Sequence, residues 1–222
     1  MKNLKNALLL RQLKQLKQFG YRYTSVSIHK ESEPNLMLPS TLEKLKSQTL
    51  KCHLCELSKS RTHVVFGEGN PQADVMFVGE GPGVTEDSTG RPFVGRSGEL
   101  LTKIIENVLF VKREEIYIAN IVKCRPPNNR TPSPEEAHTC KSFLLKQIEL
   151  IKPKIIITLG STAYHYMTGD DTGITKIRGT VLKQKGYTLV PTYHPSFLLR
   201  NPSAKKEVFE DMKKVKILMR TL

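Results

Sequence analysis

One stretch of this chain, Phe77 to Gly98, combines residue types that could do chemistry. It follows an apolar run and holds a glycine-rich turn with Gly81, the three carboxylates Glu80, Glu86 and Asp87, and the loop aromatic Phe93. Glycine lets a backbone come close to a ligand because it accepts positive φ and carries no side chain to collide. The combination indicates chemistry on something flat and polar. The alternative interpretation is a connecting loop whose acids cap helices.

The four cysteines form a second candidate group. Cys52 and Cys55 are a Cys-x-x-Cys pair, and Cys124 and Cys140 are separated by 15 residues. A close pair plus two separated thiols can ligate a zinc ion or an iron–sulfur cluster. The alternative is two redox-active thiols and two buried structural ones. The spacing alone does not separate zinc from iron.

Both groups need elements to hold them, and apolar runs alternate along the chain with helical patterns. Strands are expected at residues 73–78, 115–123, 154–159 and 188–193, and helices at 98–109, 134–151 and 204–218. The last strand is the least secure, because Pro191 removes a donor from the hydrogen-bond ladder. Continuous Ile and Val strands that alternate with helices are typical of a mostly parallel sheet covered on both faces. The predicted fold class is therefore α/β.

Polar residues follow the predicted strands at the points where they end. Glu80, Asn120, Ser161 and His194 each lie at or just after the end of a different strand. In open α/β sheets the ligand site lies at the carboxyl ends of the strands. The sequence therefore predicts one site that draws on all four strand ends.

The charge balance suggests a polyanionic partner. The chain has 35 Lys and Arg against 21 Asp and Glu, a formal net charge of +14. Such a balance favours nucleic acid or an acidic membrane surface. No apolar run is long enough to span a bilayer, and the basic start of the chain lacks a small-residue cleavage site. We expect a soluble, cytoplasmic protein.

The chain divides into an extension and a domain. Residues 1–40 predict a basic helix over 1–19 followed by a linker rich in Ser, Tyr and Pro. Residues 41–222 form the predicted domain. Its first helix begins with Ser40 as N-cap and Glu43 at the third helical position, which is a capping-box pattern.

Four motifs in order, GEGPG, GRPFVG, NIVKCRPPNNRTP and HPSFLLR, together with the cysteines, resemble the family 4 uracil-DNA glycosylases. The resemblance runs from about Leu42 to the C-terminus. It implies a three-layer α/β/α sandwich with a central four-stranded, mostly parallel sheet. It also implies that the cysteines hold a structural [4Fe-4S] cluster, through Cys52, Cys55, Cys124 and Cys140.

The resemblance implies roles for the strand-end residues in excising uracil from DNA. The enzyme must rotate the nucleotide out of the duplex into a pocket. Phe93 would stack on the flipped uracil, Asn120 would read its N3–H and O4, and His194 would donate to O2. Gly81 would let uracil or water approach the backbone, and Ser161 would bind a phosphate oxygen.

The carboxylate that activates the water is less clearly marked. Other members of the superfamily carry an acid at the position of Gly81, so the role falls to Glu80 or Glu86. We assign water positioning to Glu80 and expect Glu86 to help shape the pocket. Asp87 is expected to be a capping or solvated acid.

The motif HPSFLLR is expected to enter the DNA. Leu198 or Leu199 would fill the gap left by the flipped base, and Arg200 would meet a phosphate or a base edge. Lys123, Arg125 and Arg130 would contact the backbone.

The predicted protein is thus a monomeric, monofunctional glycosylase that hydrolyses uracil from DNA and leaves an abasic site for base excision repair. One alternative is the same fold with broader specificity for deaminated bases. The other is a non-catalytic iron–sulfur module that binds DNA.

Overall fold

A computed structural model describes residues 14, 15, 17 and 38–221 of this chain. The chain divides into two compact units, Met1–Met37 and Leu38–Leu222. Of the helix expected over residues 1–19, the three described residues are helical and exposed, and the rest lies outside the described part. The following account concerns the second unit.

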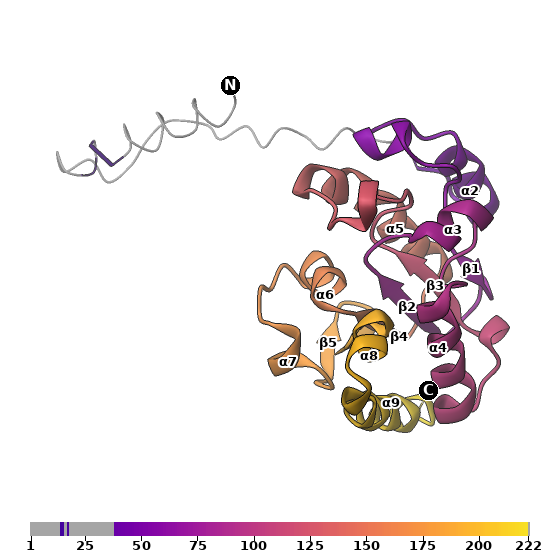
Figure 1. Ribbon diagram of the computed structural model, residues 1–222, viewed down its shortest axis with the longest axis vertical. Coiled ribbons are helices and arrows are strands. Elements are labelled where there is room, and N and C mark those ends of the chain that lie inside the picture. Colours follow the sequence, from indigo (N-terminus) through magenta and orange to yellow (C-terminus); the bar gives the residue numbers. More distant parts are fainter. Residues whose placement is uncertain (1–13, 16, 18–37, 222) are drawn as a thin grey trace. The chain divides into compact units, whose positions relative to one another are not determined.

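The centre of this unit is a six-stranded sheet in the order β1-β3-β2-β4-β6-β5 (Figure 1). The strands are β1 (Glu68–Gly69), β2 (Val75–Gly79), β3 (Tyr117–Asn120), β4 (Ile155–Leu159), β5 (Leu182–Gln184) and β6 (Tyr187–Thr192). The four inner strands run parallel, whereas β1 and β5 pair antiparallel at the two edges. Every residue of β2, β3 and β4 is buried, as apolar strands covered on both faces require.

The four expected strands are all present, but the sheet has six strands rather than four. The two additional edge strands have two and three residues, and β5 is Leu-Lys-Gln. Pieces this short and polar carry no apolar pattern that a sequence reading can detect. Pro191 is tolerated in β6 because its nitrogen and its carbonyl both face away from β4. The carbonyl accepts from Gly179 N at 2.7 Å. Pairing with β5 has already ended there, at Leu189, so no ladder donor is lost.

Helices connect the strands. They are α2 (Leu42–Leu50), α3 (Val84–Thr89), α4 (Arg96–Ile104), α5 (Pro134–Ile151), α6 (Ser161–Thr168), α7 (Ile174–Ile177), α8 (Pro195–Arg200) and α9 (Lys205–Met219). α4 continues as a π-helical turn, η2 (Ile105–Leu109). Among the described residues, no helix has both the length and the apolar character that crossing a membrane needs.

Local signals explain where these helices begin. α5 starts as predicted, with Ser133 as N-cap accepting from Glu136 N at 3.3 Å and the Glu136 carboxylate accepting from Ser133 N in return. The expected N-cap of α2 was one residue too early. Thr41, rather than Ser40, caps that helix and accepts from Lys44 N.

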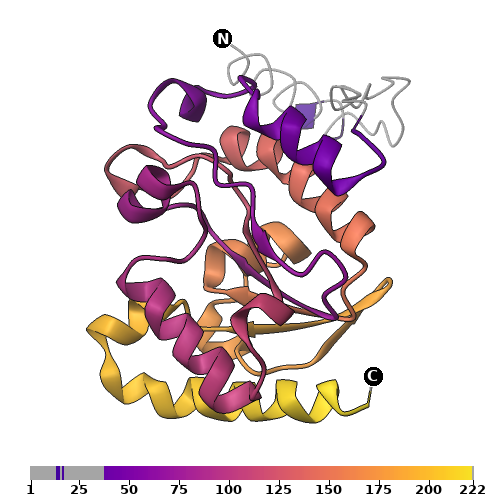
Figure 2. The same ribbon diagram turned by 90° about the vertical axis from the view of Figure 1, so that its right-hand side faces the viewer.

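The helices cover both faces of the sheet, as the α/β/α expectation required. α2 and α5 lie side by side on one face, and α4 and α9 lie on the other (Figure 2). Against that second face, Phe77 and Ile157 pack with Leu101, Ile105 and Met212 in one buried cluster. The observed architecture is a mixed, mostly parallel sheet between two helical layers.

Candidate active site

A cavity of about 420 Å³ opens at the carboxyl ends of the parallel strands. This volume lies within the range of pockets that bind small ligands. Eight of the predicted site residues line it: Glu80, Gly81, Glu86, Phe93, Asn120, Ser161, His194 and Arg200. The fold therefore brings together the residues that the strand-end argument placed at one site.

The buried amide of Asn120 has an unused acceptor. Asn120 ends β3, and its side chain is 1% exposed. Among the described residues its Oδ1 finds no hydrogen-bond partner. A buried acceptor left without a partner costs about 1–3 kcal/mol, so the arrangement favours a ligand that donates there.

Gly79 makes room for this amide and for the aromatic ring. Gly79 is paired with Asn120 across the sheet. A Cβ at position 79 would come within 2.4 Å of Asn120 Oδ1 and 2.5 Å of the Phe93 ring. The absence of a side chain at this strand end therefore allows amide and ring to share one wall of the cavity.

Phe93 is held in an uncommon backbone conformation. Its φ is +50°, in the left-handed region that residues other than glycine seldom adopt. Its side chain is 5% exposed, and the ring centroid lies 5.7 Å from that of His194. A flat apolar surface thus faces the same cavity as the amide and the imidazole.

His194 is a neutral hydrogen-bond donor in this setting. It is the N-cap of α8, and its Nδ1 accepts from Ser196 N at 3.1 Å. Because Nδ1 is an acceptor, the ring proton of the neutral form lies on Nε2. Burial, with a further contribution from the nearby Arg200 charge, lowers the pKa of His194 to about 4. The imidazole is therefore uncharged at neutral pH.

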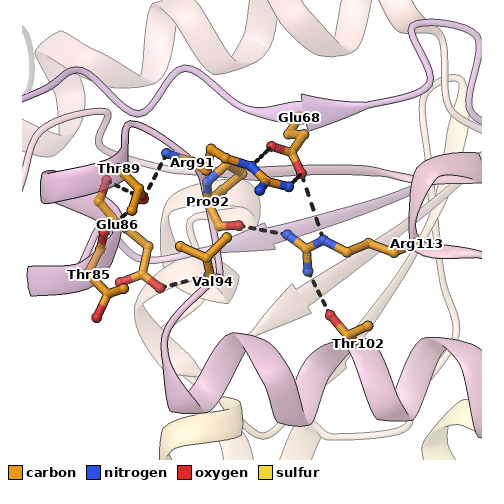
Figure 3. A network of polar contacts seen from close by, with 9 residues as sticks. All are labelled: Glu68, Thr85, Glu86, Thr89, Arg91, Pro92, Val94, Thr102 and Arg113. Carbon is orange, nitrogen blue, oxygen red and sulfur yellow. Dashed lines mark hydrogen bonds and ion pairs between the residues drawn. The ribbon is translucent and has the colours of Figure 1, made fainter.

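The two candidate glutamates differ in their partners. Glu86 is 7% exposed and accepts from three backbone N–H groups, those of Gly95 at 2.8 Å, Gly83 at 3.2 Å and Val94 at 2.9 Å. Figure 3 shows the contact with Val94. Within residues 38–221, the Glu80 carboxylate makes no hydrogen bond or ion pair. Glu86 is thus committed to the loop, whereas Glu80 is available to a ligand or water.

The structure also accounts for Asp87 and Gly81. Asp87 is buried and accepts from Thr62 N at 2.9 Å and His63 N at 3.3 Å in an earlier bend of the chain, so it is neither the solvated nor the helix-capping acid that was expected. A Cβ at Gly81 would lie 2.7 Å from Val122 Cγ2. An acid at position 81 would therefore require the buried Val122 to move.

The cavity also includes residues that the sequence reading did not assign to it. These are Pro82, Gly83, Ser97, Pro126, Asn129, Leu159, Gly160, Thr162, Ser196 and Phe197. Several belong to the motifs already quoted, so their position within CRPPNNRTP and HPSF was the available signal. Asn129 was the least accessible to prediction, because it reaches the cavity through a loop with φ of +53°.

The residues predicted to contact DNA separate into exposed and buried ones. Leu199 is 39% exposed, but Leu198 is fully buried in the core cluster. Lys123 is 1% exposed, so the expected backbone contact from it was wrong. Its ammonium instead donates to Asn120 O at 2.9 Å and to Gln147 Oε1 at 2.5 Å. Arg130 forms a two-pronged ion pair with Glu136.

The four cysteines line a second cavity, next to Arg61 and Lys123. None of the four forms a disulfide. Arg61 Nη1 donates to Cys124 Sγ at 3.3 Å, and the Lys123 N–H donates to Cys140 Sγ at 3.2 Å. Burial raises the pKa of Cys140 to about 12. In the described part of the chain, no three His, Cys, Asp or Glu side chains converge closely enough to hold one metal ion.

Known proteins match this chain over most of its length. The sequence profile of the uracil DNA glycosylase superfamily matches residues 66–213. The type-4 uracil-DNA glycosylase of Thermotoga maritima is 50% identical over 79% of this chain and 93% of its own length. Those of Sulfurisphaera tokodaii and Saccharolobus solfataricus are 47% and 46% identical, over 80% and 79% of this chain and 84% and 85% of theirs.

The profile match spans well over half of the chain, and it defines the class as the uracil-DNA glycosylase superfamily. Within that superfamily, the chain belongs to the type-4 uracil-DNA glycosylases. The family predicted from the motifs is confirmed, and with it the function in uracil removal and base excision repair.

Proposed function

We propose that the cavity at the strand ends takes up a uracil rotated out of DNA and that its side chains divide the work of cleaving the N-glycosidic bond. The observation that carries this assignment is the buried Oδ1 of Asn120, which has no partner within residues 38–221 and shares one cavity with the Phe93 ring and His194. Four steps follow: recognition, stacking, stabilisation of the leaving base and attack by water.

Asn120 reads the base. Uracil presents an N3–H donor next to the O4 acceptor, so one amide can accept from the first and donate to the second. Cytosine presents the opposite polarity at these positions and would leave buried groups unpaired. A site built in this way rejects the mismatched base strongly.

Phe93 provides the stacking surface. Stacking of a base on an aromatic side chain is worth roughly 1–3 kcal/mol. That amount is comparable to the cost of unstacking the base from the duplex, which is about a few kcal/mol. The ring therefore offsets much of the cost of rotating the nucleotide out.

His194 stabilises the departing base. Cleavage builds negative charge on uracil O2 and positive charge on the sugar, and a preorganised donor lowers the barrier. With Nδ1 occupied by Ser196 N, the Nε2–H is the donor that remains for O2. A neutral imidazole does this without bringing a positive charge near the sugar.

Glu80 holds the attacking water. Its carboxylate lines the cavity and is free of protein partners in the described range, whereas that of Glu86 is occupied by backbone amides. An anion beside the sugar also favours the positive charge that develops there. We assign Glu86 to holding the loop in shape rather than to contact with the reacting atoms.

DNA would be contacted on the α8 side of the cavity. Leu199 is exposed there and would occupy the space left by the flipped base, with Arg200 beside it. Ser161, the first residue of α6, would meet a phosphate oxygen. A monomeric state, a cytoplasmic location and the division at residue 40 stay predictions.

The four thiols that line this cavity are the donor set that a [4Fe-4S] cluster needs, and Cys52, Cys55, Cys124 and Cys140 would hold it. Each cysteine of such a cluster binds a different iron, so four thiolates need not converge on one point as zinc ligands must. The N–H groups that donate to Cys124 and Cys140 would stabilise the sulfurs in the charged form. The cluster would join the loop that holds Cys52 and Cys55 to the segment after β3 and to α5.

Incubation with a uracil-containing oligonucleotide followed by alkali tests the activity. We expect cleavage at the uracil, and no cleavage by freshly prepared, iron-loaded protein would favour a non-catalytic DNA-binding module. Oligonucleotides with hypoxanthine or xanthine test broader base choice. Metal analysis tests the cluster: brown protein with about four irons per chain supports it, and colourless protein with bound zinc contradicts it.

A further inference from the structure

The strained conformation of Phe93 must be held in place by its surroundings. A residue other than glycine at φ of +50° is less stable than in its ordinary conformations, and it persists only where neighbouring contacts fix it. The loop Gly90–Gly95 carries this residue between α3 and α4. Its polar contacts therefore decide whether the stacking ring faces the cavity.

The chain after Phe93 is fixed by α3 and α4. The Glu86 carboxylate accepts from the N–H groups of Val94 and Gly95. The Phe93 backbone rests directly on α4, since a Cβ at Gly98 would lie 2.0 Å from both the carbonyl carbon and the oxygen of Phe93. These contacts hold one end of the loop.

The chain before Phe93 is held by a side chain from outside the cavity. Arg113 lies in the short helical turn before β3, and its side chain is 12% exposed. Its Nη2 donates to Pro92 O at 2.7 Å, and its Nη1 donates to Thr102 Oγ1 on α4 at 3.0 Å (Figure 3). Arg113 therefore joins the loop to α4 at the residue that precedes Phe93.

The charge of Arg113 is compensated on its other side. Its Nε lies 3.8 Å from Glu68 Oε1 on β1, and the same carboxylate receives both prongs of the exposed Arg91. The planar guanidinium presents donors on three separate nitrogens, whereas an ammonium has its donors on a single nitrogen and cannot reach all these acceptors with the same geometry. Arg113 does not line the cavity, so it does not touch the substrate.

We propose that Arg113 is a positioning residue that acts through Phe93: by holding the Pro92 carbonyl against α4, it keeps the aromatic ring oriented for stacking on uracil. Glu86 and Gly98 fix the loop after the ring, and Arg113 fixes it before the ring. The proposal rests on the uracil pocket described above.

The test compares Arg113→Ala and Arg113→Lys with Arg91→Ala, an exposed arginine of the same loop. The readout is the inhibition constant of free uracil, measured beside the affinity for uracil-free DNA. Both Arg113 variants should weaken uracil binding about 5- to 100-fold, the range that base stacking covers, with DNA affinity unchanged. Arg91→Ala should stay within about twofold, as exposed ion pairs contribute little. Unchanged uracil binding in folded Arg113→Ala protein would overturn the proposal.

A double-mutant cycle separates positioning from general stability. If Arg113 acts through the ring, Arg113→Ala should weaken uracil binding little further in a Phe93→Ala background. Fully additive losses would contradict the proposal.

Thr102→Val, which removes the other acceptor of Arg113 at nearly constant shape, gives a milder variant if Arg113→Ala does not fold. If Phe93→Ala loses uracil binding but Thr102→Val keeps it, this result would also contradict the proposed role of Arg113. If Phe93→Ala leaves uracil binding intact, the stacking role itself fails.

Discussion

At the scale of single residues, the roles proposed for the pocket depend on which polar atoms already have protein partners. Asn120 Oδ1 is buried and has no partner among the residues that the structure describes, and His194 has one nitrogen occupied by Ser196. Glu86 is filled by backbone donors, which leaves Glu80 as the available carboxylate. The chemistry of each side chain therefore follows from what its neighbours have left unused.

Replacing Asn120 by aspartate tests the reading of the base. The carboxylate still accepts from N3–H but cannot donate to O4, and its charge opposes that of the leaving uracil. We expect kcat/KM for uracil excision to fall about 10- to 100-fold, the cost of an unmet buried hydrogen bond. Asn70→Asp, at an exposed turn outside the cavity, should leave the rate unchanged. Equal rates for the two variants would contradict the role of Asn120.

The low pKa of His194 predicts that the free energy of unfolding depends on pH in the acid range. Its pKa is about 4 in the folded protein and about 6.5 when unfolded. Between these values the unfolded chain binds a proton that the folded protein excludes, so the free energy of unfolding falls as the pH is lowered from about 6.5 to 4. Denaturant unfolding at several pH values measures this, and His194→Gln should flatten part of the slope. An unchanged slope would show that the imidazole titrates normally.

At the scale of elements, the strand ends were predictable and the loops between them were not. Strands with apolar runs such as IIITL are predictable from the sequence. The strand ends place Asn120 and His194 at one cavity, as expected. The edge strands β1 and β5 are too short and polar to be seen in a sequence. The contact of Arg113 with Pro92 joins residues 21 apart and has no sequence pattern at all.

Helix α8 shows the same limit, because spacing could not decide which of two adjacent leucines faces solvent. Leu198→Ala should destabilise the protein by about 2–5 kcal/mol, as for other buried leucines. Leu199→Ala should change stability by less than about 0.5 kcal/mol but slow excision from duplex more than from single-stranded DNA. Thermal melts and paired excision assays measure both effects. A Leu199→Ala protein that excises equally well from both substrates would remove the wedge role.

At the scale of the whole molecule, the basic charge and the cysteine cavity lie outside what the pocket alone explains. The formal charge of +14 predicted a polyanionic partner, in keeping with the family. The buried Lys123 connects the two sites, since its N–H donates to Cys140 and its ammonium to the carbonyl of Asn120. The amino-acid composition could not reveal that a lysine in a basic motif would be buried and make these two contacts.

The salt dependence of DNA binding tests the electrostatic part. The logarithm of affinity should fall linearly with the logarithm of salt concentration, and each lost phosphate contact lowers the slope by about 0.9. Arg200→Gln should therefore reduce the slope by about one, whereas Arg220→Gln, near the C-terminus, should not. A comparison with and without residues 1–37 measures the contribution of that segment. An Arg200→Gln slope equal to that of the parent would place Arg200 away from the phosphates.

The most direct test of the pocket is the single-turnover rate of uracil excision by Glu80→Gln, with enzyme in excess over a uracil-containing oligonucleotide. Glutamine keeps the size of the side chain but cannot take a proton from water. We predict a loss of about 100-fold or more, the typical contribution of a positioned acid or base. Affinity for the uncleaved DNA should be unchanged, and Glu99→Gln, on the exposed side of α4, should act at the parental rate. Full activity in Glu80→Gln would contradict the assignment.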